Sequence, residues 1–299
     1  MTRFRADALL LLVALIWGTT FVAQKDANSH IGPLLFVAAR FALAALFLAP
    51  LAVWEARRCR TSLSRADWKA AGWISLCLCS GCWFQQIGLQ TTSAGHAGFM
   101  TAVYLAVVPF VAWAMSGHAP RARVLLACAV ALGGAWLLGG GSDLGQWSRG
   151  DVIILAGDVV WAAHITLVGH CEGICARPVL LSLLQCCVTA VLTLPLALAW
   201  EGAAWNGLWP AAPAIGYAGI ASSGLAFTLQ IVAQRHAPPA EAALIMSLES
   251  VFAAVAGALL LHEMMSLRAA TGAALILLGV MLVEAATLFP KSVQAPSAD

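Results

Sequence analysis

Three charged side chains stand inside long apolar stretches of this chain, where a charge is unfavourable. They are Arg40, Asp158 and Glu249. A charge taken out of water destabilises a protein unless it is paired or hydrated, so each of the three is a candidate site residue. Arg40 is suited to binding a carboxylate, whereas Asp158 or Glu249 is suited to binding an amine or a proton. The alternative is an internal clamp, in which the arginine and a carboxylate only hold helices together.

Aromatic and polar side chains recur at helical spacing in several of these stretches. Trp17, Thr20 and Phe21 share one face of the first stretch, because residues i, i+3 and i+4 are neighbours on a helix. An amide facing lipid would be unfavourable, so the faces that carry glutamine are expected to point inward. They predict a pocket with aromatic walls and amide or hydroxyl groups. The candidate substrate-binding residues are Trp17, Thr20, Phe21, Arg40, Trp83, Gln86, Tyr104, Trp161, His164, Phe227 and Gln230, with Asp158 and Glu249 as possible coupling residues.

One polar stripe occurs twice in the chain, which bears on how it is interpreted. Cys79, Trp83, Gln86 and Gln90 return as Ser223, Phe227, Gln230 and Gln234. The alternative to a pocket is that amides and hydroxyls bond across packed helices while tryptophans fill space. The repetition favours the pocket.

The composition indicates that lipid is the solvent of this chain. Of its 299 residues, 61% are hydrophobic and only 10% are charged, and the mean hydropathy is +0.87. A soluble protein of this length would expose apolar patches that cause aggregation. The net charge of +2 is small and no dense basic face occurs, so nucleic acid is not an expected partner.

The apolar runs predict an all-α integral membrane protein with ten transmembrane helices. A helix needs about 20 mainly apolar residues to cross the hydrocarbon. Runs of that kind lie at residues 6–24, 33–54, 70–90, 95–116, 121–138, 150–170, 178–200, 211–233, 239–261 and 267–289. The connections are short, so no soluble domain and no scaffold for a protein partner fits between the spans.

The distribution of lysine and arginine predicts the orientation. With the N-terminus inside, the cytoplasmic segments carry Arg3, Arg5, Arg57, Arg58, Arg60, Arg65, Lys69, Arg121, Arg123, Arg177, Arg235 and Lys291. The opposite side carries only Lys25, Arg149 and Arg268. Positive residues concentrate on the cytoplasmic side of membrane proteins. We therefore expect a multi-pass protein of the cell inner (plasma) membrane with both termini in the cytoplasm.

The chain repeats itself at an offset of 144 residues. Asp7 recurs as Asp151, and Trp17 as Trp161. This predicts a first five-helix repeat at 1–148, a second at 149–290 and a short cytoplasmic tail at 291–299. Because five is odd, the two repeats face opposite ways. Inverted repeats with a site near the bilayer midplane are typical of secondary transporters.

Motifs in the same order as those of a known family occur along nearly the whole chain. They are the run 14–25 (ALIWGTTFVAQK), Pro33 with Arg40-Phe41, Thr92-Ser93-Ala94-Gly95 with Pro109, Leu248-Glu249 with Val251-Phe252 and Leu261-His262-Glu263, and Gly272 with Gly279. The chain thus resembles the drug/metabolite transporter superfamily of the EamA type. It departs from that pattern at Ser250, where the family usually carries proline.

The resemblance implies ten helices, an inverted five-plus-five repeat and export of small metabolites from the cytoplasm. The stripes rich in tryptophan and glutamine are similar to those of the aromatic amino acid exporters of this group. The expected function is export of small amphipathic metabolites, chiefly aromatic and other hydrophobic amino acids, by alternating access. The alternative is a multidrug or other metabolite exporter driven by proton exchange. The expected partners are the small-molecule substrate and membrane lipid, and the oligomeric state, monomer or homodimer, is left open.

An enzymatic function is not expected. The sequence His262-Glu263-Met264-Met265-Ser266 starts like a zinc-protease motif but lacks the second histidine. Six of the nine cysteines lie inside apolar runs, where cysteine behaves as a small hydrophobic residue. We therefore expect no metal and no cofactor.

Overall fold

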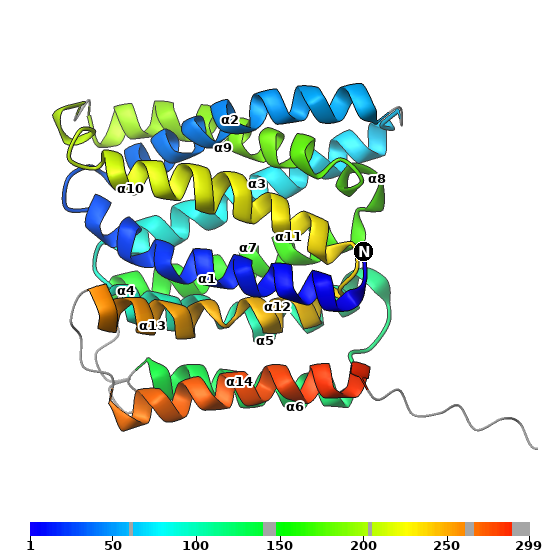
Figure 1. Ribbon diagram of the computed structural model, residues 1–299. Coiled ribbons are helices and arrows are strands. Elements are labelled where there is room, and N and C mark those ends of the chain that lie inside the picture. Colours follow the sequence, from blue (N-terminus) through cyan, green and yellow to red (C-terminus); the bar gives the residue numbers. More distant parts are fainter. Residues whose placement is uncertain (60–61, 140–147, 203–204, 261–265, 289–299) are drawn as a thin grey trace, which may run out of the picture.

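The described part of the chain is entirely helical (Figure 1). The computed structural model describes residues 1–59, 62–139, 148–202, 205–260 and 266–288. The tail at 291–299, Arg60 and the His262-Glu263 pair lie outside these residues. The first half comprises α1 (Arg3–Ala27), α2 (Pro33–Arg58), α3 (Arg65–Gly88), α4 (Ala94–Thr101), α5 (Tyr104–Ser116) and α6 (Ala122–Leu138). The second half comprises α7 (Arg149–His170), α8 (Glu172–Cys175), α9 (Pro178–Trp200), η2 (Trp205–Gly207), α10 (Ala212–Tyr217), the π-helical η3 (Ala218–Ala226), α11 (Phe227–Gln234), α12 (Pro239–Met246), α13 (Glu249–Leu260) and α14 (Leu267–Leu288).

Many of these helices are long and apolar enough to cross a membrane. In the described residues, seven segments meet that condition: Arg3–Ala27, Pro33–Arg58, His96–Ser116, Arg149–His170, Pro178–Trp200, Ala212–Gln234 and Pro239–Leu259. Two shorter apolar helices lie at Ala122–Leu138 and Leu267–Val283. The prediction of an all-helical membrane protein is confirmed, whereas ten passes in two inverted repeats stays a prediction.

Three predicted spans are interrupted in ways that the apolar pattern did not reveal. The span at 95–116 breaks between α4 and α5, and the span at 239–261 breaks between α12 and α13. The span at 211–233 contains the nine-residue π-helix η3. At the second break, Ser247 Oγ donates to Leu244 O and Ser250 Oγ donates to Ser247 O, each at 2.7 Å. Serine hydroxyls that bond the backbone locally compete with regular helix geometry, so Ser250 helps to end a helix here without a proline.

Helices α2 and α9 cap one another at both ends of an antiparallel pair. The carboxylate of Glu55, near the end of α2, accepts from the N–H groups of Val179 and Leu180 at 3.1 and 2.9 Å. The carboxylate of Glu201, just after α9, accepts from the N–H groups of Leu34 and Leu35 at 2.8 and 2.9 Å. The first N–H groups of a helix have no partner within it, and a negative charge there is stabilised by the helix dipole. The two glutamates therefore fix the register of the pair.

Helices α6 and α14 form a second pair at one edge of the molecule (Figure 1). A Cβ atom added to Gly134 would lie 2.6 Å from Gly272 O, and one added to Gly279 would lie 2.9 Å from the Cβ of Ala131. The small residues thus let the two backbones touch, as the spacing of alanines at 127, 131 and 135 predicts.

The reciprocal caps generate a prediction about stability. Replacing Glu55 or Glu201 by alanine leaves two partly buried N–H groups without their acceptor, and we expect each change to reduce the free energy of unfolding by about 1–3 kcal/mol. The midpoint of thermal unfolding in detergent, followed by circular dichroism, should fall by several degrees for each variant. Asp26, which is 62% exposed, provides the control, because Asp26→Asn removes a carboxylate that caps no other helix. Midpoints equal to that of the control would contradict the capping role.

Candidate functional site

A cavity of about 490 Å³ lies inside the helical bundle. Residues from both halves of the chain line it, from α1, α2, α3, α4, α5, α7, η3, α11 and α13. The lining residues are Trp17, Thr20, Phe21, Gln24, Arg40, Cys82, Gln85, Thr101, Tyr104, Trp161, Ile165, Ser222, Phe227, Gln230 and Glu249.

Most of the side chains singled out from the sequence meet at this cavity. Those that line it are Trp17, Thr20, Phe21, Arg40, Tyr104, Trp161, Phe227, Gln230 and Glu249. Four others do not line it: Trp83, Gln86, Asp158 and His164. All the residues selected on α1 and α11 line the cavity, whereas on α3 and α7 helical spacing did not decide which side chains reach it.

Three of those four residues bond to neighbouring helices instead. Trp83 Nε1 donates to Thr193 Oγ1 on α9 at 2.7 Å. Gln86 Nε2 donates to Gln24 O on α1 at 3.2 Å and to Asn28 Oδ1 at 2.8 Å. His164 Nε2 lies 2.7 Å from Gln185 Oε1, also on α9. For these side chains the interhelical hydrogen bonds that were considered as the alternative are present.

Asp158 remains unusual, since it is buried on α7 with only 1% of its surface exposed. Among the described residues, neither of its carboxylate oxygens has a hydrogen-bond partner. A buried polar group without a partner is rare in a folded protein and calls for a functional explanation.

The cavity contains residues that the sequence reasoning did not select. Gln24 and Ile165 stand on the faces already identified for α1 and α7, one or two turns from the selected residues. Gln85 is the neighbour of Gln86 on α3. By contrast, Thr101 ends α4 and Ser222 lies in the π-helix η3, and no stripe in the sequence pointed to either position.

Arg40 brings a permanent positive charge to the cavity. Arg40 is only 3% exposed, and its Nη1 donates to Gln24 Oε1 at 3.0 Å. The guanidinium carbon lies 5.0 Å from the ring centre of Phe41 and 5.4 Å from that of Phe36, within the range of cation–π attraction. Among the described residues, Arg40 Nε has no hydrogen-bond partner. The group is therefore held in place while part of its donor capacity is unused.

Glu249 supplies an acidic group to the same cavity, at the start of α13. In the described part of the chain, no ion pair joins it to Arg40. The internal clamp considered from the sequence is thus not formed by these two residues. One cavity offers both a cation and an acid, which suits a ligand that carries both charges.

An aromatic wall faces these charged groups, with Phe227 at its centre. The ring of Trp17 lies 4.9 Å from that of Phe227, and the ring of Trp161 stacks on Phe227 at 6.2 Å with only 8° between the planes. Trp17 and Trp161 occupy equivalent positions of the repeat, so each half contributes one tryptophan. The wall provides an apolar, flat surface for a ring or an aliphatic side chain.

Both broken helices border the cavity. Thr101 ends α4, Tyr104 begins α5 and Glu249 begins α13, and all three residues line the cavity. The two breaks are equivalent, because α5 begins at residue 104 and α13 at residue 249, an offset of 145 that is within one residue of the repeat. Helix ends in the middle of a membrane protein expose backbone groups that can bind polar ligands.

Comparison with known proteins agrees with this architecture. The model of the EamA-like transporter family matches residues 4–140 and again residues 148–285. An uncharacterized transporter from Archaeoglobus fulgidus is 29% identical over 251 residues, which cover 84% of this chain and 76% of the relative. A solved crystal structure superposes with a TM-score of 0.76 at 17% identity, over 97% of this chain and 100% of the other. That likeness shows a shared fold.

The state of Arg40 generates a second prediction about stability. A buried charge without a counter-ion is destabilising, so Arg40→Met should raise the unfolding temperature by about 2–4 °C. Arg40→Lys keeps the charge and serves as the control, for which we expect no gain. Thermal unfolding of the purified protein in detergent measures both. A clear decrease for Arg40→Met would mean that Arg40 mainly holds the helices together.

Proposed function

This chain belongs to the EamA-like transporter family, and from that premise we propose that it exports small amphipathic metabolites, chiefly aromatic and other hydrophobic amino acids. The observation that carries the substrate class is the cavity, which combines Arg40, Glu249 and a wall of three aromatic rings. A hydrophobic amino acid has the matching groups: a carboxylate, an ammonium group and an apolar side chain.

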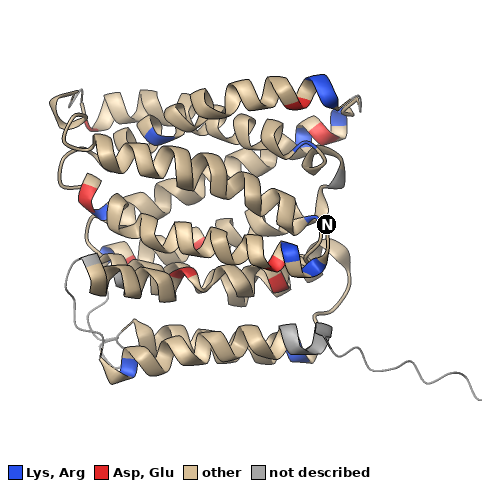
Figure 2. Ribbon diagram, viewed as in Figure 1, with Lys and Arg blue, Asp and Glu red and all other residues tan. Residues whose placement is uncertain are grey.

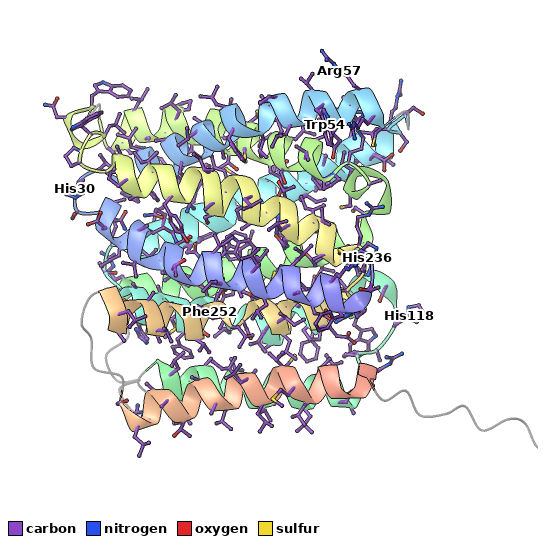
Figure 3. The ribbon with its side chains drawn as sticks, viewed as in Figure 1. His30, Trp54, Arg57, His118, His236 and Phe252 are labelled. Atoms are coloured by element: carbon purple, nitrogen blue, oxygen red, sulfur yellow. The ribbon has the colours of Figure 1, made fainter. Side chains whose placement is uncertain are left out.

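We also propose that the protein lies in the inner (plasma) membrane and crosses it ten times. Both termini are then in the cytoplasm. In Figure 3, Arg57, His118 and His236 lie at one end of the bundle and His30 lies at the other. The N-terminus lies at the first of these ends, where many of the lysines and arginines gather (Figure 2). This distribution supports the positive-inside orientation expected from the sequence.

The packing supports two inverted five-helix repeats. In the repeat, α7 is the equivalent of α1, and the α10–α11 segment is the equivalent of α3. Helix α1 packs against the α10–α11 segment, and α7 packs against α3. Two further pairs of equivalent helices pack against one another, α2 with α9 and α6 with α14. The end of α1 and the start of α7 meet at Thr92, which contacts both Lys25 and Asp151, so the two equivalent helices run in opposite directions. This is the pattern expected of two repeats that are related by a two-fold axis in the membrane plane.

The mechanism that follows is alternating access around the cavity. Arg40 would bind the substrate carboxylate and Glu249 or Gln230 its ammonium group, while Trp17, Trp161 and Phe227 hold the apolar side chain. Rocking of the two halves would open the cavity first to the cytoplasm and then to the outside. The substrate drives this exchange only if it binds the two states differently.

Transport of labelled phenylalanine into proteoliposomes tests the role of Arg40. We expect Arg40→Gln to lower the initial rate roughly tenfold or more, because the carboxylate loses its charged partner. A phenylalanine methyl ester has no free carboxylate, so its transport should change little in the same variant. Arg57→Gln, which removes an exposed arginine at the end of α2, is the matched control. Equal losses for both substrates would contradict the assignment of the carboxylate to Arg40.

Proton-driven export of drugs or other metabolites is the second candidate. It is favoured by two buried carboxyl groups, that of Glu249, which lines the cavity, and that of Asp158, which does not. These two groups are also our proposed coupling residues, whatever the substrate. Among the described residues between Trp17 and Gln24 on α1, no acidic residue is present to play that role.

The coupling proposal is tested by imposing a pH gradient on proteoliposomes. If Glu249 carries the proton, Glu249→Gln should abolish the stimulation of uphill transport by the gradient while exchange of labelled for unlabelled substrate persists. Asp158→Asn reports separately on Asp158, and Asp26→Asn is the control for removal of an exposed carboxylate. Uphill transport by Glu249→Gln that still responds to the gradient would exclude Glu249 as the coupling group.

A further inference from the structure

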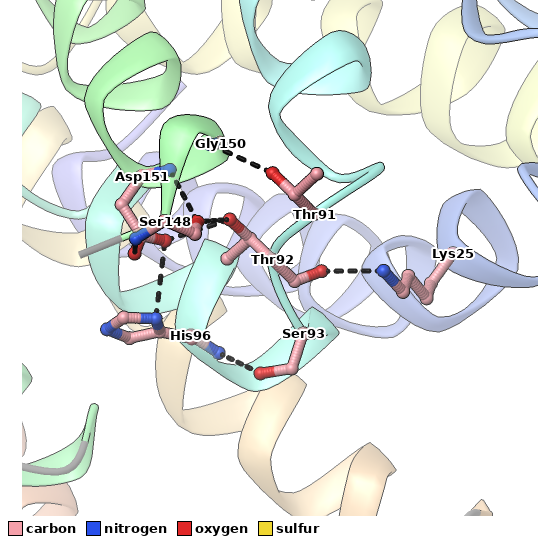
Figure 4. Close-up of polar contacts among 8 residues, drawn as sticks. All are labelled: Lys25, Thr91, Thr92, Ser93, His96, Ser148, Gly150 and Asp151. Atoms are coloured by element: carbon pink, nitrogen blue, oxygen red, sulfur yellow. Dashed lines mark hydrogen bonds and ion pairs between the residues drawn. The ribbon is translucent and has the colours of Figure 1, made fainter. Parts of the chain in front are cut away.

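A dense set of polar contacts, drawn in Figure 4, lies where α1 ends, at the end of the bundle opposite to the N-terminus (Figure 1). Lys25 Nζ, in the last turn of α1, donates to the carbonyl oxygens of Leu89 and Thr92 at 2.8 Å each and to that of Gln90 at 3.3 Å. The segment between α3 and α4 is therefore tied to α1, within the first half of the chain.

The same segment is tied to the second half through Asp151. The carboxylate of Asp151 accepts from Thr92 Oγ1 at 2.8 Å, and Nδ1 of His96 lies 3.3 Å from it. Beside it, Gly150 N donates to Thr91 Oγ1 at 2.9 Å. Asp151 is only 1% exposed, whereas 31% of the side chain of His96 is exposed. A buried carboxylate of one half thus holds a histidine of the other half that water can reach.

The orientation of Asp151 is fixed by its own helix. Its second carboxylate oxygen accepts from Ser148 N at 2.8 Å, and Ser148 Oγ accepts from Asp151 N at 3.1 Å. This reciprocal capping box leaves Oδ1 aimed at Thr92 and His96.

The repeat equivalent of Asp151 takes part in a contact of the same kind at the other end. Asp7 accepts from Arg3 Nε at 2.8 Å, and Arg3 Nη1 lies 3.0 Å from a carboxylate oxygen of Glu241. Arg3 and Asp7 belong to α1 in the first half, while Glu241 belongs to α12 in the second. Each end of the bundle therefore has a polar contact between the halves, and in each cluster the aspartate at this repeat position binds a member of that contact.

We propose that these two clusters are the latches of the transport cycle: Asp151 with Thr92 and His96 outside, and Arg3 with Asp7 and Glu241 inside. This inference rests on the proposed alternating access. When the halves separate at one end, the contacts between them at that end must break, while those at the other end persist. The outer latch closes the external gate and the inner latch closes the cytoplasmic gate.

The test measures access to the cavity from each side, using the lining residue Cys82. In a variant that keeps Cys82 and replaces the other eight cysteines by serine, a membrane-impermeant thiol reagent is added outside or inside sealed vesicles. We expect Thr92→Val and Asp151→Asn to increase labelling from outside roughly tenfold, and Glu241→Gln to increase it from inside only. His96→Ala, which removes one of the contacts of Asp151, should also increase labelling from outside, with all variants compared at one pH.

Thr92→Val separates a gating role from a folding role, because it removes a donor to Asp151 and leaves the capping box with Ser148 intact. Unchanged external labelling in Thr92→Val and Asp151→Asn, or an equal rise from both sides, would overturn the outer latch. Unchanged external labelling in His96→Ala would overturn the role of the histidine. The labelling needs no substrate, so a failure of phenylalanine transport with side-specific labelling intact would refute the substrate and leave the latches standing.

Discussion

A polar group that leaves water for hydrocarbon must find its partner inside the protein, and this structure depends on that constraint. It explains why the described chain is helical throughout and why its helix ends are so carefully bonded. Glu55 on α2 accepts from N–H groups at the start of α9, and Glu201 after α9 accepts from N–H groups at the start of α2. The two helices therefore stabilise one another at both ends. Where the chain breaks between α4 and α5 and between α12 and α13, Thr101, Tyr104 and Glu249 line a polar cavity.

The two repeats share one helical framework, and the residues in which they differ determine the chemistry of the cavity. Trp17 and Trp161 are equivalent and flank the same phenylalanine, which makes the aromatic wall nearly symmetric. Arg40, however, corresponds to Leu184, so only one half brings an arginine to the cavity. A two-fold frame with two similar end states suits a cycle that alternates between them, while a one-sided charge gives the ligand a single preferred orientation.

Stability and function make opposite demands on the centre of the bundle. Arg40 and Asp158 keep polar atoms without partners among the described residues, although burial makes such atoms unfavourable. Tight packing elsewhere compensates, as at Gly134 and Gly272, where the backbones of α6 and α14 are in contact. The polar centre thus lies among tightly packed helices, as expected of a preorganised binding site.

Hydrophobic runs indicated an all-helical membrane protein, residues that recur 144 positions apart indicated its twofold repeat, and the helical period of 3.6 residues indicated which side chains share a face. They placed Trp17, Thr20 and Phe21 on one face because neighbours on a helix are determined by local geometry alone. They did not determine that Trp83 turns to Thr193 or His164 to Gln185, since both partners lie on α9. Which side chains reach the cavity, and where α4 and α12 end, depend on how the helices pack, and packing is a property of the tertiary structure.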